Sequence, residues 1–189
     1  MSSTVKPANA DHAGTFGRMT AFHGQMGMFT RALAYILSHG ADGLRRVAED
    51  AVLNANYLLR SLEDVLDAPF AGSGPCMHEA LFSDRGFTGG LSTLDLAKGL
   101  IDEGFHPMTM YFPLVVHGAM LVEPTETESK AAMDQFIGAM RSIAERAKAG
   151  DQSLKAAPVH APRRRLDETL AARKPILTYR TPEVAVAAE

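Results

Sequence analysis

The sequence lacks several patterns that would assign it to a particular class of protein. It contains a single cysteine, Cys76, which excludes an internal disulfide framework and fits a reducing compartment. No run of about 18 apolar residues is present, and the first residues lack the apolar core of a signal peptide. The net charge of −3 gives no general attraction for nucleic acid or an anionic membrane. We therefore expect a cytoplasmic protein that binds neither.

Motifs for phosphate or metal chemistry are also missing. The glycines at 72–74 and 89–90 match neither a Walker loop nor a strand–GxGxxG–helix context. His78 and Glu79 resemble the start of a zinc-protease motif, but Phe82 stands where the second histidine is required. Because a second and a third ligand are missing from the motif, no metal site is predicted. We expect His78 to be a strand residue that is hydrogen-bonded inside the domain.

The spacing of apolar residues predicts two long helices in the first third of the chain. Steps of three and four residues over 19–37 predict the first helix, and Gly40 is placed to end it. The second helix is predicted to start at Asp42, which is a candidate N-cap, and to end before Pro69.

Smaller elements are predicted to follow. Residues 77–83 have the pattern of a strand, and short extended segments are expected at 111–113 and 120–122. Between them, Ser92 is placed to cap a short helix that Gly104 stops.

A longer helix is predicted after these strands. Thr125 and Glu128 satisfy the capping-box pattern at its start, and Gly150 is placed at its end. Residues 151–189 are expected to form an extended tail over a surface, with the basic run at 163–165 in salt bridges. The residues predicted to form the buried face of the helix are Met133, Phe136, Ile137, Met140, Ile143 and Ala147.

Together these elements predict an α/β fold of the small α+β type. Two long N-terminal helices precede a small sheet with packed helices. Residues 1–16 are expected to be a disordered arm, residues 17–150 the domain and residues 151–189 the tail.

The stretch 104–129 is typical of the rim of an active site, because a loop, a strand and a helix start are rich there in hydroxyls and carboxylates. His106 lies on the loop, where it could line a site or fix the loop by a hydrogen bond. Thr125 is explained by capping, and Glu126 is left to face a cleft. Cys76 is expected to be a packed thiol, because nothing near it in sequence would lower its pKa. Without a nucleophile or a metal cluster, the chain is expected to be part of an enzyme.

Seven segments and the basic tail occur in the order found in one known family. The tail, residues 164–177, is similar to the second subunit of the two-subunit bacterial form. The segments are 17–24, 31–36, 51–58, 76–79, 104–107, 111–114 and 123–129. Over residues 17–178 the chain thus resembles the C-terminal part of the pyridoxal-phosphate enzyme of the glycine cleavage system.

The resemblance implies the C-terminal domain of a fold-type I pyridoxal-phosphate-dependent transferase. Its expected activity is decarboxylation of glycine, with transfer of the aminomethyl group to the lipoyl arm of the H-protein. Pyridoxal 5'-phosphate is expected to be held mainly by a larger upstream domain, which carries the lysine that binds it covalently. None of the six lysines here stands in the family's His-Lys context, so the chain is expected to be inactive alone.

The partners that the resemblance implies are subunit 1, the upstream part of subunit 2 and the lipoylated H-protein. His106, Thr125 and Glu126 are the expected lining residues, and no catalytic residue is expected in this chain. Two other interpretations remain. The chain could be a non-catalytic remnant or binding module that docks on other glycine-cleavage subunits, or an unrelated α/β ligand-binding domain.

Overall fold

The computed structural model describes residues 23–178. The chain divides into two compact units between Leu44 and Arg45, and each unit is considered by itself. The predicted arm at 1–16 and the last residues of the predicted tail, 179–189, lie outside the described residues.

Helix α1 runs from Met26 to Leu62, and its backbone leaves the helical conformation at Gly40. Gly40 has φ 63° and ψ −175°, which glycine adopts without the steric cost of a Cβ atom. The predicted break between two helical stretches at Gly40 is confirmed, but the first stretch begins at Met26, because residues 23–25 are not helical. The part of the prediction at 19–22 lies outside the described residues. Helical backbone resumes so soon that Asp42 lies within α1 and not ahead of it.

A three-stranded antiparallel sheet forms one layer of the second unit, with the strand order β1-β3-β2. Ala80 pairs with Val122, and Phe82 pairs with Met120. Since alternate residues of a strand point to opposite faces, these four buried side chains share one face of the sheet. The strands are β1 (Ala80–Phe82), β2 (Thr109–Met110) and β3 (Met120–Val122).

The strands are shorter than the sequence predicts, except at 120–122, where the prediction is confirmed. The expected extended segment at 111–113 is wrong, because Tyr111 has φ 58° and turns the chain. The Tyr111 N–H donates to the Ala119 carbonyl at 2.7 Å, which closes the connection between β2 and β3 directly after Met110.

Helix α2 (Thr93–Asp102) begins and ends where the sequence predicts. The backbone N–H and the hydroxyl of Ser92 donate to Asp95 Oδ2 at 2.9 and 3.0 Å, so this carboxylate fixes the helix start. At the other end, Gly104 has φ 85°. Its N–H and that of Phe105 donate back to the last turn of α2, the pattern of a Schellman motif.

Helix α3 (Lys130–Lys148) starts later than predicted. Its N-cap is Ser129, whose Oγ accepts the Ala132 N–H at 3.1 Å. The prediction that Thr125 and Glu128 form the capping box is therefore wrong. The Glu128 N–H instead donates to the Thr125 carbonyl at 3.2 Å, in a turn that precedes the helix. The predicted stop at Gly150 is confirmed by its φ of 74°.

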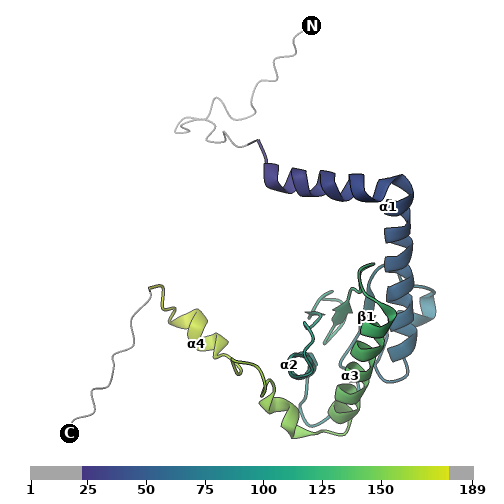
Figure 1. Ribbon diagram of the computed structural model, residues 1–189. Coiled ribbons are helices and arrows are strands. Elements are labelled where there is room, and N and C mark those ends of the chain that lie inside the picture. The colour runs from purple at the N-terminus through teal and green to yellow at the C-terminus, as the bar shows by residue number, and fades with distance from the viewer. Residues whose placement is uncertain (1–22, 179–189) are drawn as a thin grey trace, which may run out of the picture. The chain divides into compact units, whose positions relative to one another are not determined.

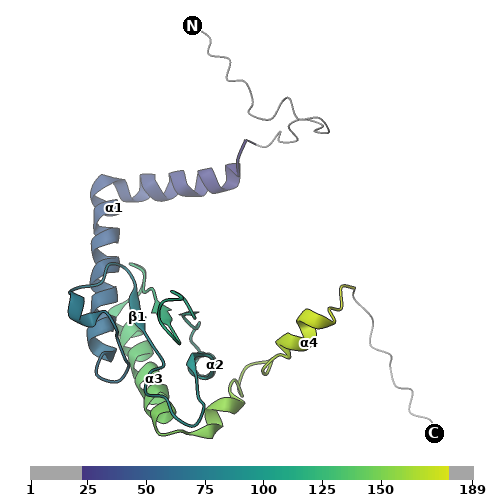
Figure 2. The same cartoon turned by 180° about the vertical axis from the view of Figure 1, so that it is seen from behind.

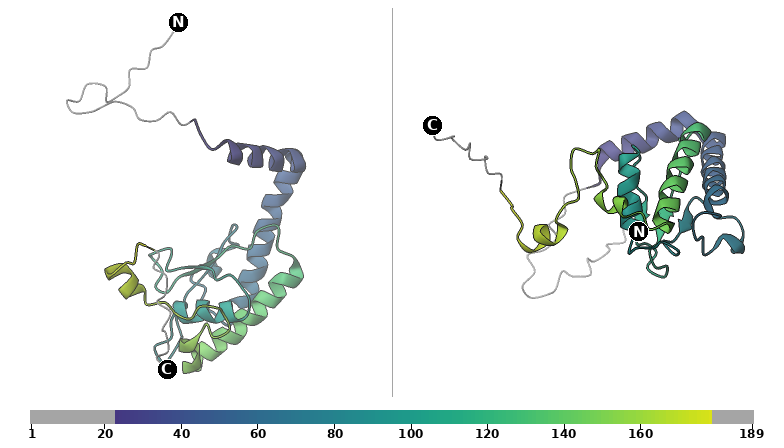
Figure 3. Two further views of the ribbon diagram at one scale, coloured as in Figure 1. Left: turned by 60° about the vertical axis from the view of Figure 1, so that its left-hand side comes forward. Right: turned by 90° about the horizontal axis from the view of Figure 1, so that it is seen from below.

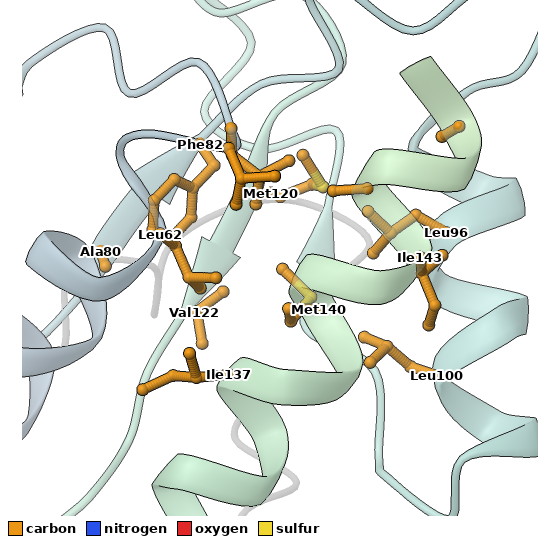
Figure 4. Packing of buried hydrophobic residues seen from close by; sticks show 14 of the residues in the cluster. Leu62, Ala80, Phe82, Leu96, Leu100, Met120, Val122, Ile137, Met140 and Ile143 are labelled. Atoms are coloured by element: carbon orange, nitrogen blue, oxygen red, sulfur yellow. The ribbon is translucent and has the colours of Figure 1, made fainter. Parts of the chain in front are cut away.

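The core of the second unit lies between the sheet and the helices. Helices α2 and α3 lie next to each other beside the strands, as the opposite views in Figures 1 and 2 and the view from below in Figure 3 show. Figure 4 shows side chains of β1, β3, α2 and α3 packed together in one hydrophobic core. Of the predicted buried face of α3, only Phe136 is partly exposed. The largest core side chains are Leu58, Leu62, Phe82, Leu96, Leu100, Met120, Met140, Ile143 and Leu154.

The polypeptide after α3 is more ordered than an extended tail. A short 3-10 helix, Gln152–Ala156, inserts Leu154 into the core. Within the basic run at 163–165, Arg165 forms the predicted kind of salt bridge, with Asp95 of α2, whereas Arg163 and Arg164 are exposed. A further short helix, α4, spans Glu168–Arg173 and has no buried residue.

Candidate functional site

A cavity of about 380 Å³ opens where three parts of the second unit meet: the loop after α2, the end of β3 and the first turns of α3. This volume falls in the range of small-molecule sites. Its wall is mostly apolar, with a few polar groups. The principal lining residues are Leu58, Phe105, His106, Met108, Thr109, Leu121, Glu123, Glu128, Met133 and Phe136.

His106 lines this cavity on the loop between α2 and β2, and this loop is anchored just before the histidine. Gly104 ends α2 immediately before it, and Phe105 packs edge-on against Phe136 of α3 with ring centroids 5.4 Å apart. The His106 Nδ1 lies 2.8 Å from the Pro107 carbonyl oxygen. Because a carbonyl oxygen only accepts, Nδ1 carries the proton and Nε2 of the neutral ring is left to accept from a ligand. The loop-fixing bond and the lining position therefore occur together.

The turn that carries the other two expected lining residues is fixed by Asn54 of α1. Asn54 is 9% exposed, and its Nδ2 donates to the Thr125 carbonyl at 2.9 Å and to the Glu128 carbonyl at 3.4 Å. Thr125 and Glu126 lie in this turn but are not among the residues that line the cavity. The Thr125 hydroxyl pairs with that of Thr127 at 2.8 Å. The carboxylates of the cavity are instead those of Glu123 and Glu128.

The polar groups of the cavity favour one kind of ligand. Among its lining residues there is no lysine or arginine, while Glu123 and Glu128 both bear carboxylates. A phosphate group placed there would meet negative charge without a compensating cation. An apolar ligand that ends in a cation or a hydrogen-bond donor suits the cavity better.

The cofactor implied by the family does not fit the described residues. A lysine must be unprotonated to bond covalently to a carbonyl cofactor. The Lys130 amine instead donates to Asp134 at 2.7 Å and to the Tyr57 hydroxyl at 3.1 Å, and these hydrogen bonds raise the pKa of Lys130. None of the lysines between residues 23 and 178 lines the cavity.

Cys76 is a packed thiol, as predicted. It is half-buried, and this burial raises the pKa of its thiol. Its backbone is held by a reciprocal pair: Asn56 Nδ2 donates to the Cys76 carbonyl at 2.7 Å, and the Cys76 N–H donates to Asn56 Oδ1 at 3.0 Å. A thiol in this state is a poor nucleophile at neutral pH.

Sequence reasoning missed two asparagines of α1 that fix distant backbone, one of them in the turn beside the cavity. Asn54 and Asn56 fix the turn at 125–128 and the backbone of Cys76 respectively. A signal was available, because asparagine is a poor helix former and prefers to bond to nearby backbone groups. An asparagine on the apolar face of a strongly helical segment therefore indicates a specific polar partner.

His78 is not placed as the sequence suggests. It precedes β1, and its side chain is 51% exposed, so the expectation of a hydrogen-bonded strand histidine inside the domain is wrong. The strand begins only at Ala80, so His78 lies in the chain just before the start of β1.

No helix within residues 23–178 combines the length and the apolar character that crossing a bilayer requires.

Comparisons with known proteins agree with the resemblance seen in the sequence. Residues 47–162 match the family model described as "Glycine dehydrogenase, C-terminal domain". The protein named "Probable glycine dehydrogenase (decarboxylating) subunit 2" from Caulobacter vibrioides is 66% identical over 179 residues, covering 90% of this chain and 34% of that protein. A protein of the same name from Shouchella clausii is 49% identical over 172 residues, covering 90% of this chain and 35% of that protein.

Among solved structures, the crystal structure of glycine decarboxylase (P-protein) of the glycine cleavage system, in inhibitor-bound form, is 21% identical with a TM-score of 0.48. The match covers 58% of this chain and 24% of that chain. The present chain spans about a third of the length of the curated relatives it matches. The family model and the two relatives show that the chain belongs to the family of glycine dehydrogenase C-terminal domains.

Proposed function

We propose that this chain supplies the C-terminal domain of a glycine dehydrogenase (decarboxylating). The reaction is decarboxylation of glycine, with transfer of the aminomethyl group to the lipoyl arm of the H-protein. The observation that carries the proposal is the family match over residues 47–162. Pyridoxal phosphate, when bound, supplies the electron sink for decarboxylation. The lysine that holds it belongs to other polypeptide, which is consistent with relatives about three times as long.

In this proposal the cavity forms part of the wall that faces the reacting groups. The Nε2 of His106 is the acceptor directed at a bound ligand, and the apolar residues around Phe105 exclude water. Thr125 and Glu126 are proposed to lie at the rim, in the turn that Asn54 holds. His106 in the wall and the two rim residues bind and orient, and they do not perform the covalent chemistry.

The first unit supports a contact with larger polypeptide. Its helical stretch presents exposed apolar side chains at steps of three and four residues, which is an unpartnered amphipathic face. We assign the remainder of the glycine dehydrogenase as its occupant, because about two thirds of the length of each relative lies outside the matched region. The exposed side chains are Met26, Phe29, Leu33, Ile36 and Leu37.

The same face favours the second candidate function, a binding module without catalysis. Such a module would dock through this helix on other glycine-cleavage subunits and change their assembly. It would not restore turnover.

The test begins with the purified 189-residue chain alone. Mixed with pyridoxal phosphate, it should show no stoichiometric, glycine-responsive absorption of lysine-bound cofactor, and borohydride should trap no stoichiometric adduct at a single lysine. It should release no labelled carbon dioxide from glycine. Carbon dioxide release by the isolated chain would overturn the proposal.

Reconstitution then separates the two candidate functions. Adding the chain to subunit 1, the separately produced remainder of subunit 2 and lipoylated H-protein should restore glycine–bicarbonate exchange. Phe29→Glu and Leu33→Glu should abolish this gain, because a charge on the apolar face opposes burial, whereas Ser38→Glu should not. Co-purification with these subunits without restored exchange would favour the binding module.

A further inference from the structure

Three metal-ligating side chains meet at the outer end of the paired strands β1 and β3. The Nε2 of His78 lies 3.7 Å from Glu79 Oε1 and 4.0 Å from Glu123 Oε1. One ligand atom from each of the three residues lies within 4.8 Å of the others. No metal site was predicted from the sequence because the segment around His78 and Glu79 lacks a second histidine. The fold brings in Glu123 from a distant segment.

The strand register explains why these residues meet. Ala80 pairs with Val122, so the next residues outward, Glu79 and Glu123, face each other across the antiparallel strands. Like charges directly opposite each other in a sheet repel. The register is fixed by buried pairing further along the strands, between Phe82 and Met120, and cannot slip to relieve this repulsion. The cluster is therefore held in place by a core that does not depend on it.

The contacts within the cluster do not occupy the electron pairs that would bind a metal ion. At 3.7 and 4.0 Å, neither contact of His78 with the two carboxylates is a hydrogen bond. All three side chains are at least a third exposed, so an ion from solution can reach their free electron pairs. A bound cation would offset the repulsion between Glu79 and Glu123 more fully than a histidine at these distances.

The donor set indicates the class of ion. One imidazole nitrogen and two carboxylate oxygens suit zinc and neighbouring divalent transition metals, whereas calcium and magnesium prefer oxygen ligands alone. Bonds of about 2.0–2.2 Å in a tetrahedral shell place ligand atoms roughly 3.3–3.6 Å apart. The two separations from His78, 3.7 and 4.0 Å, are close to this range, and the three ligand atoms, all within 4.8 Å of one another, must draw closer together by side-chain rotation. Three protein ligands leave the fourth position for water.

We propose that His78, Glu79 and Glu123 bind one divalent transition-metal ion of the zinc class, with water completing its coordination. Glu123 also lines the cavity, so the ion lies at the rim of the candidate functional site. This inference does not rest on the proposed enzyme activity.

The experiment uses the full 189-residue chain without a polyhistidine tag. Zinc is titrated against a chromophoric chelator, and cobalt(II) is added separately to record the visible absorption of a tetrahedral site. We expect saturable binding of one equivalent. His78→Gln, Glu79→Gln and Glu123→Gln should each weaken zinc binding about tenfold or more. Circular dichroism of each variant checks that it is folded.

Matched controls are needed because the chain contains seven histidines. His160→Gln and Glu103→Gln replace exposed residues that lie outside the cluster and should leave zinc affinity unchanged. The proposal is overturned if the folded chain shows no saturable zinc binding, or if folded His78→Gln binds zinc as tightly as the unaltered chain.

Discussion

Arg165 donates from Nη2 to Asp95 Oδ1 at 2.8 Å and so joins the polypeptide after α3 to the first turn of α2. The Asp95 side chain is only 7% exposed. The same guanidinium donates to the Ala157 carbonyl at 2.7 Å and to the Leu154 carbonyl at 2.9 Å. One side chain thus satisfies a nearly buried carboxylate and two backbone acceptors.

Arg165→Met should therefore lower the free energy of unfolding by about 2 kcal/mol, because it leaves the Asp95 carboxylate without its cation. Urea denaturation measures the loss. Arg164→Met is the matched control, since its side chain is exposed, and its change should stay within about 0.5 kcal/mol. Equal losses in the two variants would show that the salt bridge does not stabilise the fold.

Stability at acid pH should depend on Asp151. Hydrogen bonds from Ser153 and Arg146 lower the pKa of this carboxyl from 3.8 to about 2. A carboxyl whose pKa is lower in the folded state stabilises the fold above its unfolded pKa, near pH 4. That contribution is lost as the pH falls toward about 2.

Asp151→Asn should consequently be less stable than the unaltered chain near neutral pH, and the difference should shrink through this acid range. Urea unfolding at a series of pH values tests this. A difference that stays constant down to the lowest pH would contradict the assignment.

Two glycines should respond to alanine in opposite directions. Gly118 has φ 59°, and a Cβ atom there would overlap the Asp84 carboxylate, so Gly118→Ala should cost about 3 kcal/mol. Gly138 lies in α3, where a Cβ atom would meet nothing within 4 Å. Gly138→Ala should stabilise the chain by about 1 kcal/mol. Thermal and urea unfolding of both variants would show the two signs, and a shared sign would refute the steric argument.

Asn54→Asp should loosen the turn at 125–128 without changing side-chain size. The carboxylate cannot donate, so it would face the carbonyl oxygens of Thr125 and Glu128 without a hydrogen bond. We expect a loss of about 2 kcal/mol. Hydrogen exchange of the amides in this turn should accelerate more than exchange in α2, which serves as the internal reference. Uniform acceleration in both places would point to general destabilisation.

Local patterns were enough to predict both ends of α2, and the end and the buried face of α3. The stops at Gly104 and Gly150 depend only on the conformational freedom of glycine at the end of a helix. The start of α2 depends on Ser92 and a carboxylate three residues later. The buried face of α3 follows from spacing alone, and burial in the structure matches it closely.

Features that depend on distant contacts were beyond this reasoning. Thr125 and Ser129 are both acceptable N-caps by residue type. In the structure Thr125 lies in a turn whose carbonyl accepts a hydrogen bond from Asn54, and the helix starts after this turn, with Ser129 as its N-cap. The strand register that sets Glu79 opposite Glu123 is likewise invisible in sequence. His106 was identified as a candidate because a short loop carries it, but the glutamates of the cavity were not separated from their neighbours.

The three consecutive arginines have a consequence for handling this protein. Arg163 and Arg164 are exposed, whereas the Arg165 guanidinium is held by Asp95. A trypsin-like protease that cuts between Arg164 and Arg165 would put the guanidinium on the departing peptide. The Asp95 carboxylate would then lose its cation, and the Leu154 carbonyl would lose the hydrogen bond that it accepts from Arg165. Cleavage of one exposed peptide bond would thus destabilise the core, and preparations should be kept free of such proteases.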